Sequence, residues 1–135
     1  MHSRQRDLRP ARALPVLAIL ALCASTLAPA PARAASNVDA GKRLFMGHCA
    51  VCHKRDASGG IKLGDTESAD LQSPGLEKMY HNDDTLMRRA IMDGKDEEGG
   101  NLDTIMPRWG HVANRLTVAQ VNDIIAFLKT QKTKN

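Results

Sequence analysis

The clearest pattern in the sequence is the recurrence of apolar residues at helical spacing in three separate stretches. These positions are Val38, Gly41, Leu44 and Phe45, then Leu86, Ala90 and Ile91, and finally Val121, Ile124, Ile125 and Leu128. Spacings of three and four residues place such side chains on one face of an α-helix. No run alternates with the two-residue period of a strand and no internal repeat occurs, so the pattern predicts an all-α fold.

Residues that favour helix ends flank these stretches. Asn37 precedes the first, Asp83 or Asp84 precedes the second, and Thr117 with Gln120 has the spacing of a capping box before the third. Gly94 is expected to end the second helix. Ser73–Pro74 has the pattern of a cap followed by a residue favoured at the first helical position, which predicts another short helix over residues 74–80. We therefore expect three or four helices.

The chain offers little material for a hydrophobic core. Its four aromatic residues are Phe45, Tyr80, Trp109 and Phe127, and residues 56–72 and 94–109 are polar, glycine-containing segments typical of loops. Small domains of this kind are marginally stable unless something else fills their centre. A large apolar prosthetic group would supply the missing interior.

The first 34 residues have the pattern of an export signal. Four arginines and a single acidic residue precede an apolar run at 14–28 that is too short to span a bilayer. Alanines on both sides of Arg33 form the small-x-small pattern that signal peptidase recognises. We expect a signal peptide over residues 1–34, cleavage after Ala34 or Ala35, and one periplasmic domain over residues 35–135. Alternatively, the run is retained as an N-terminal membrane anchor.

Removing the expected signal peptide changes the net charge. The full chain has 19 Lys and Arg against 15 Asp and Glu, and residues 1–34 hold five of the former and one of the latter. The domain therefore carries 14 of each and has no net formal charge. The basic balance that would suggest nucleic-acid binding disappears, and nucleic acid is not expected as a partner.

The segment from His48 to His53, HCAVCH, carries the most specific chemistry in the sequence. Cys49 and Cys52, three residues apart and followed directly by His53, have the spacing that attaches a c-type haem. Two thiols at this spacing reach the two vinyl-derived carbons on one edge of the porphyrin, and the adjacent imidazole lies under the iron. The motif thus predicts covalent attachment through both cysteines and His53 as the proximal iron ligand.

Other interpretations of the motif fit the sequence less well. A redox-active CxxC is typical of a βαβ pattern, which is absent from the sequence. A zinc site needs further ligands at comparable spacing, whereas His48, His81 and His111 are scattered. A structural disulfide between Cys49 and Cys52 would leave His53 and the shortage of core unexplained.

From about Asn37 to Lys129 the chain resembles a class I cytochrome c. The matching pieces are Gly41 and Phe45 before HCAVCH, the segment TIMPRW from Thr104 to Trp109, and LTVAQVNDIIAFLKT from Leu116 to Thr130, in the order of the family. The resemblance implies three to four helices around one covalently bound haem c. The family usually has a proline soon after the haem motif, near the carbonyl that holds the proximal histidine. Here the first proline is Pro74, which leaves the carbonyl partner of His53 unassigned.

The distal iron ligand is expected to be Met106. It lies in an irregular segment, precedes Pro107, which disfavours helix there, and matches the family's axial methionine. Most other methionines lie in predicted helices, where such residues commonly fill core gaps. Met92, and His81 or His111 as a second histidine ligand, remain alternatives. Arg108 and Trp109, which follow Met106, are candidates to donate to a haem propionate.

Ligation by His53 and Met106 implies an electron carrier and not an enzyme. With both axial positions taken, the iron has no vacant site, and the soft thioether favours the ferrous state. The expected partners are redox proteins, a donor and an acceptor, that dock transiently through small interfaces; no small-molecule substrate is expected. Alternatives are a cytochrome subunit of a larger dehydrogenase or terminal oxidase, including a membrane-bound respiratory complex, a haem catalyst or gas sensor with an open iron site, and a binding module without haem.

Overall fold

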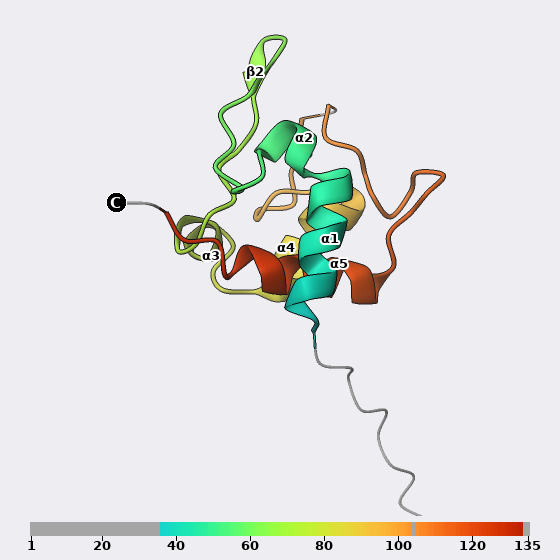
Figure 1. Ribbon diagram of the computed structural model, residues 1–135. Coiled ribbons are helices and arrows are strands. Elements are labelled where there is room, and N and C mark those ends of the chain that lie inside the picture. Colours follow the sequence, from blue (N-terminus) through green and yellow to red (C-terminus); the bar gives the residue numbers. More distant parts are fainter. Residues whose placement is uncertain (1–35, 104, 134–135) are drawn as a thin grey trace, which may run out of the picture. The chain divides into compact units, whose positions relative to one another are not determined.

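The computed structural model describes residues 36–103 and 105–133 (Figure 1). Five helices and two short strands occur there: α1 (Val38–His48), α2 (Ala50–His53), β1 (Lys62–Leu63), β2 (Thr66–Glu67), α3 (Gly75–Met79), α4 (Asp84–Asp93) and α5 (Val118–Leu128). The helix-dominated architecture confirms the all-α prediction. The expected signal peptide and its cleavage site lie outside the described residues. Within the described part, no helix has the length and apolar character needed to cross a bilayer.

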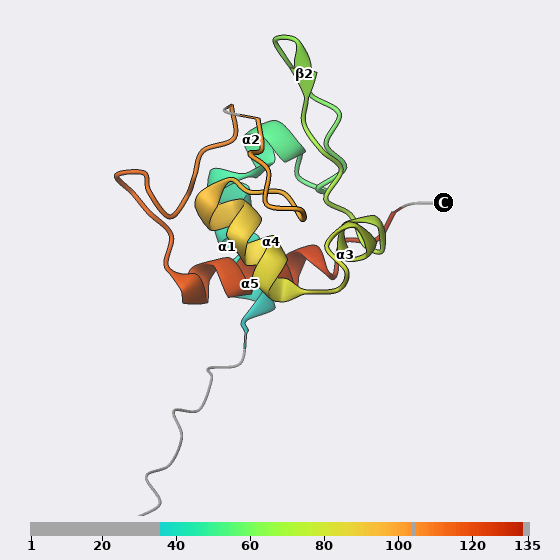
Figure 2. The ribbon, with the colours of Figure 1, turned by 180° about the vertical axis from the view of Figure 1, so that it is seen from behind.

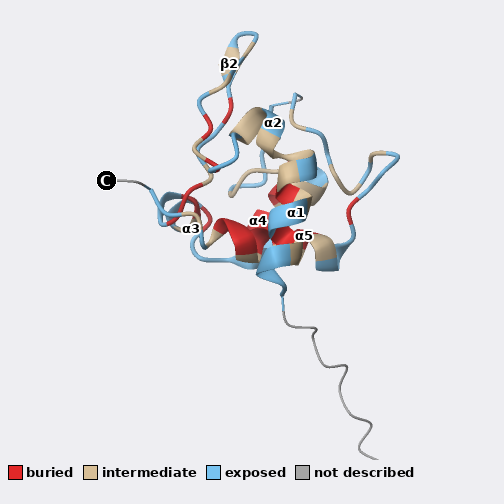
Figure 3. Cartoon of the chain, viewed as in Figure 1, coloured by how far each residue is buried: buried red, intermediate tan, exposed pale blue. Residues whose placement is uncertain are grey.

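The core forms where α1 crosses α5 (Figure 1). Phe45 of α1 and Phe127 of α5 are buried, and their ring centroids are 5.3 Å apart. Gly41 allows the crossing, because a Cβ at this position would lie 1.9 Å from the backbone oxygen of Asp123. Viewed from behind, α4 lies alongside α5 (Figure 2). Buried residues are concentrated where these three helices meet (Figure 3).

The expected caps set four helix ends. Asn37 accepts a hydrogen bond from the Ala40 N–H, Thr117 and Gln120 form a reciprocal capping box, and Gly94 ends α4 in the left-handed conformation with φ 65°. Asp83, the first of the two alternatives, caps α4 by accepting a 2.7 Å hydrogen bond from the Thr85 N–H. Local sequence therefore determines where these helices begin and end.

Three details of the predicted elements need correction. The structure has five helices among the described residues because the haem motif forms its own turn, α2, and residues 56–72 contain an antiparallel hairpin in which Lys62 pairs with Glu67. The third helix is Gly75–Met79, with Pro74 at its N-cap, and Ser73 does not cap it. Ser73 is instead buried, where it hydrogen-bonds Glu77 and accepts a bond from Lys132, whose segment pairs with the Ser73 backbone.

The cap at Asp83 should make stability depend on pH. The hydrogen bond from the Thr85 backbone, the largest cause, lowers the pKa of Asp83 below its ordinary value of 3.8. A lowered pKa stabilises the folded state when the pH is above the ordinary pKa of the group. This contribution is lost as the pH falls through the pKa of the folded state. The melting temperature of the wild type should exceed that of Asp83→Asn near pH 7, and the gap should close below pH 3.8. A gap that stays constant down to acid pH would contradict this assignment.

Candidate haem site

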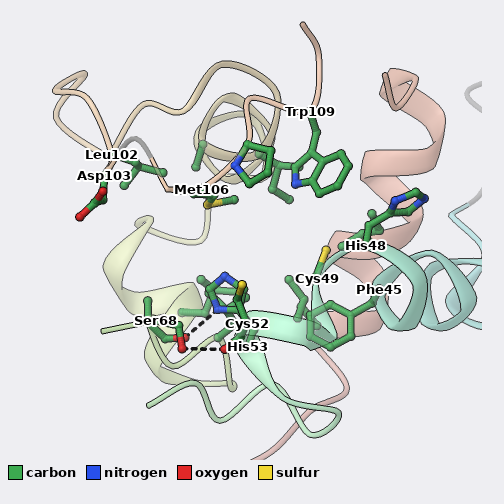
Figure 4. A pocket seen from close by; sticks show the side chains of 18 of the residues that line it. Phe45, His48, Cys49, Cys52, His53, Ser68, Leu102, Asp103, Met106 and Trp109 are labelled. Carbon is green, nitrogen blue, oxygen red and sulfur yellow. Dashed lines mark hydrogen bonds between the residues drawn. The ribbon is translucent and has the colours of Figure 1, made fainter. Parts of the chain in front are cut away.

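A cavity of about 260 Å³ lies between the haem motif, the hairpin, α4, α5 and the segment that follows α4 (Figure 4). Most of its walls are apolar and include Phe45, Leu76, Ile124 and Leu128. Five predicted site residues line it: Cys49, Cys52, His53, Met106 and Trp109. The fold therefore brings residues that are more than 50 positions apart in sequence to one apolar chamber.

The two cysteines lie where α1 ends and α2 begins. Cys49 is the C-cap of α1, and Cys52 lies within α2. Both sulfurs extend toward the cavity (Figure 4). Cys49 and Cys52 are not joined to each other in a disulfide. Burial, and secondarily the charge of Cys52, raises the pKa of the Cys49 thiol to about 12. Such a shift marks an environment that disfavours charge, as the wall of an apolar prosthetic group would require.

The His53 ring is held by a backbone carbonyl. Its Nδ1 lies 2.9 Å from the oxygen of Ala69. Because a carbonyl can only accept, Nδ1 carries the proton and the lone pair of Nε2 is left for a metal. Ala69 is therefore the carbonyl partner that the sequence left unassigned. Sequence reasoning missed it because a backbone acceptor has no side-chain signature and no proline marks this position.

Met106 extends into the cavity from the side opposite His53 (Figure 4). Its segment is fixed at both ends, since the Leu102 N–H donates to Gly94 and the Trp109 N–H donates to Ile91. The alternative ligands Met92, His81 and His111 are not among the lining residues.

A methionine and a histidine that were not expected at the site also line the cavity. Met87 of α4 is buried in the core, and the His48 ring packs edge-on against Trp109 with centroids 5.0 Å apart. Met87 occupies a core position on the α4 stripe, and His48 directly precedes the haem motif, but neither signal specifies a cavity wall.

The two candidate propionate donors differ in position. Trp109 is half-buried and lines the cavity, whereas Arg108 is exposed and is not among the lining residues. The Arg108 side chain packs against Gly94 at the end of α4. A contact between either residue and a propionate stays a prediction.

The donor set fits a covalently attached haem. Two thiols lie close to an imidazole whose Nε2 is available, a thioether faces it, and the remaining walls are mostly apolar. Among the described residues, no group of three or more His, Cys, Asp or Glu side chains could hold a metal ion.

These features define a small all-α protein built around one prosthetic group. The family model for cytochrome c matches residues 38–132. The chain therefore belongs to the cytochrome c family, whose cofactor is covalently bound haem c and whose members are typically electron carriers. Neither the search of curated proteins nor that of solved structures found a match.

Proposed function

We propose that this protein is a periplasmic monohaem electron carrier. In this proposal Cys49 and Cys52 bind the haem covalently, His53 is the proximal ligand and Met106 the distal ligand. The observation that carries the proposal is that all four side chains line one cavity, with His53 and Met106 on opposite sides of it (Figure 4).

Each residue has a distinct part in this function. The cysteines fix the position of the cofactor, and the Ala69 carbonyl fixes the tautomer of His53. The apolar walls exclude water, which limits reorganisation when the charge of the site changes. The Met106 thioether, a soft ligand, stabilises the reduced state. The haem supplies the one-electron Fe(III)/Fe(II) couple.

The proposed partners are a protein donor and a protein acceptor that dock transiently. The absence of net charge on residues 35–135 favours docking without strong long-range steering. Val51, between the two cysteines, is 78% exposed, and Ile105, beside Met106, is 48% exposed. These apolar side chains next to the site would suit a small contact surface. The periplasmic location rests on the export pattern of residues 1–34.

Covalent haem attachment tests the proposal. We expect the full chain, produced in a host with the c-type maturation machinery, to retain haem after acid and organic extraction, because thioether bonds survive both treatments. The double variant Cys49→Ser/Cys52→Ser should lose it. The wild type should fractionate with the periplasm and elute from gel filtration near its own mass. Extractable haem in the wild type would overturn the site, and stable co-elution with a larger complex would overturn the free carrier.

A further inference from the structure

The hairpin loop that supplies the Ala69 carbonyl is tied to the haem motif by a second side chain, Ser68. We propose that Ser68 is a positioning residue: its hydroxyl holds the Ala69 carbonyl in place and so sets the strength of the hydrogen bond from His53. This inference rests on the proposed role of His53 as an iron ligand. It adds that Ser68, at the base of the hairpin, tunes the properties of that ligand.

Two hydrogen bonds join the consecutive residues Cys52 and His53 to the consecutive residues Ser68 and Ala69. The Ser68 hydroxyl donates to the Cys52 carbonyl at 2.7 Å, and His53 Nδ1 donates to the Ala69 carbonyl at 2.9 Å (Figure 4). Cys52 directly precedes His53, and Ser68 directly precedes Ala69. The two bonds therefore close a small ring through two peptide units, and this ring limits how far the carbonyl can move from the imidazole.

Ser68 is buried, and its hydroxyl both donates and accepts a hydrogen bond. Besides donating to Cys52, its oxygen accepts a 3.0 Å bond from the Ile61 N–H. Its own N–H donates to Ile61, and its carbonyl accepts from the Gly60 N–H. A serine with every polar group paired has little freedom, so the base of the hairpin is held rigidly against α2.

Gly59 provides the space for this arrangement. A Cβ at Gly59 would lie 2.2 Å from the Ala69 oxygen, the acceptor for His53, and the residue has a φ of +58°. Its N–H donates to the His53 carbonyl at 3.1 Å. The loop thus contacts the proximal histidine residue at both its ring and its backbone, with Ser68 as the side chain that fixes the distance.

The strength of the His53 bond has a redox consequence. A firm acceptor on Nδ1–H makes the imidazole a more basic ligand, which favours the more highly charged ferric state. Loosening the Ala69 carbonyl should therefore raise the reduction potential and expose the Nδ1 proton to exchange. A serine that only stabilised the loop would change neither property.

The test compares holoprotein variants at the two loop serines. Ser68→Ala removes the tie, Ser68→Thr keeps a hydroxyl, and Ser58→Ala removes a loop hydroxyl that bonds Asp56. In the reduced protein we expect the His53 Nδ1 proton to exchange about five- to tenfold faster in Ser68→Ala, as for weakening of one hydrogen bond. The potential of this variant should rise. Ser68→Thr and Ser58→Ala should match the wild type in both measurements.

Exchange of the Ile124 backbone amide in α5 separates a local effect from general destabilisation, and it should not change. If Ser68→Ala does not mature, Ser68→Cys, a weaker donor, should show smaller changes of the same sign. Unchanged exchange and potential in the Ser68 variants, or equal changes in Ser58→Ala, would overturn the inference. A wild type with haem but without an iron-bound His53 signal would instead overturn the proposed ligand.

Discussion

Replacing Met106 by alanine is expected to lower the reduction potential by about 0.1 V or more, a modest part of the roughly 0.8 V over which axial ligands set haem potentials. The reason is the loss of the soft thioether that favours ferrous iron, a ligand effect characteristic of cytochromes c. The variant should also bind carbon monoxide rapidly when reduced, because one axial position becomes available. Redox titration and the visible spectrum after addition of carbon monoxide measure both effects.

The control for Met106 is Met87, the second methionine at the cavity wall. Met87→Leu conserves side-chain volume and should cost less than about 1.5 kcal/mol of stability. Its reduction potential and its slow binding of carbon monoxide should match those of the wild type. The opposite result, in which Met106→Ala retains the wild-type spectrum while Met87→Leu loses it, would move the ligand to α4. If both variants kept the wild-type spectrum, His48, another side chain in the cavity wall that could bind iron, would become the candidate ligand.

The sequence predicted well those features that depend on neighbouring residues. The caps at Asn37, Asp83 and Thr117 act over two or three residues, and the apolar stripe of α5 is buried as its spacing requires. The haem motif was equally readable, because covalent attachment demands two cysteines and a histidine at fixed spacing. Local rules of this kind leave a direct mark on the amino-acid order.

Features that depend on distant backbone groups were not predictable. Ala69 acts through its carbonyl, which every residue has, and its approach to His53 depends on how the hairpin folds back over α2. Ser73 looked like a helix cap, but its backbone pairs with the chain near Lys132, 59 positions away, and this pairing outweighs the local preference. Such positions follow from tertiary packing, which a single sequence does not specify by pattern.

Substituting Gly41 by alanine should destabilise the holoprotein by about 3 kcal/mol or more, at the upper end of the usual cost of overpacking. The added Cβ would lie 1.9 Å from the Asp123 oxygen and 2.4 Å from its carbonyl carbon. These are backbone atoms of α5, so no flexible side chain can move aside, and the two helices must separate. Because α1 leads into Cys49 and α5 supplies Ile124 to the cavity wall, the yield of haem-loaded protein should also fall. Guanidinium unfolding followed by circular dichroism measures the change.

The same helix contains its own control, because a Cβ at Gly47 would meet no atom within 4 Å. Alanine is the better helix former by about 1 kcal/mol, so Gly47→Ala should be neutral or slightly stabilising. The same intrinsic gain is present in Gly41→Ala, and the difference between the two variants therefore isolates the helix crossing from helix propensity. Equal stability of both variants would mean that α1 and α5 do not approach closely at Gly41. The walls of the haem cavity would then have to be positioned by contacts other than this crossing.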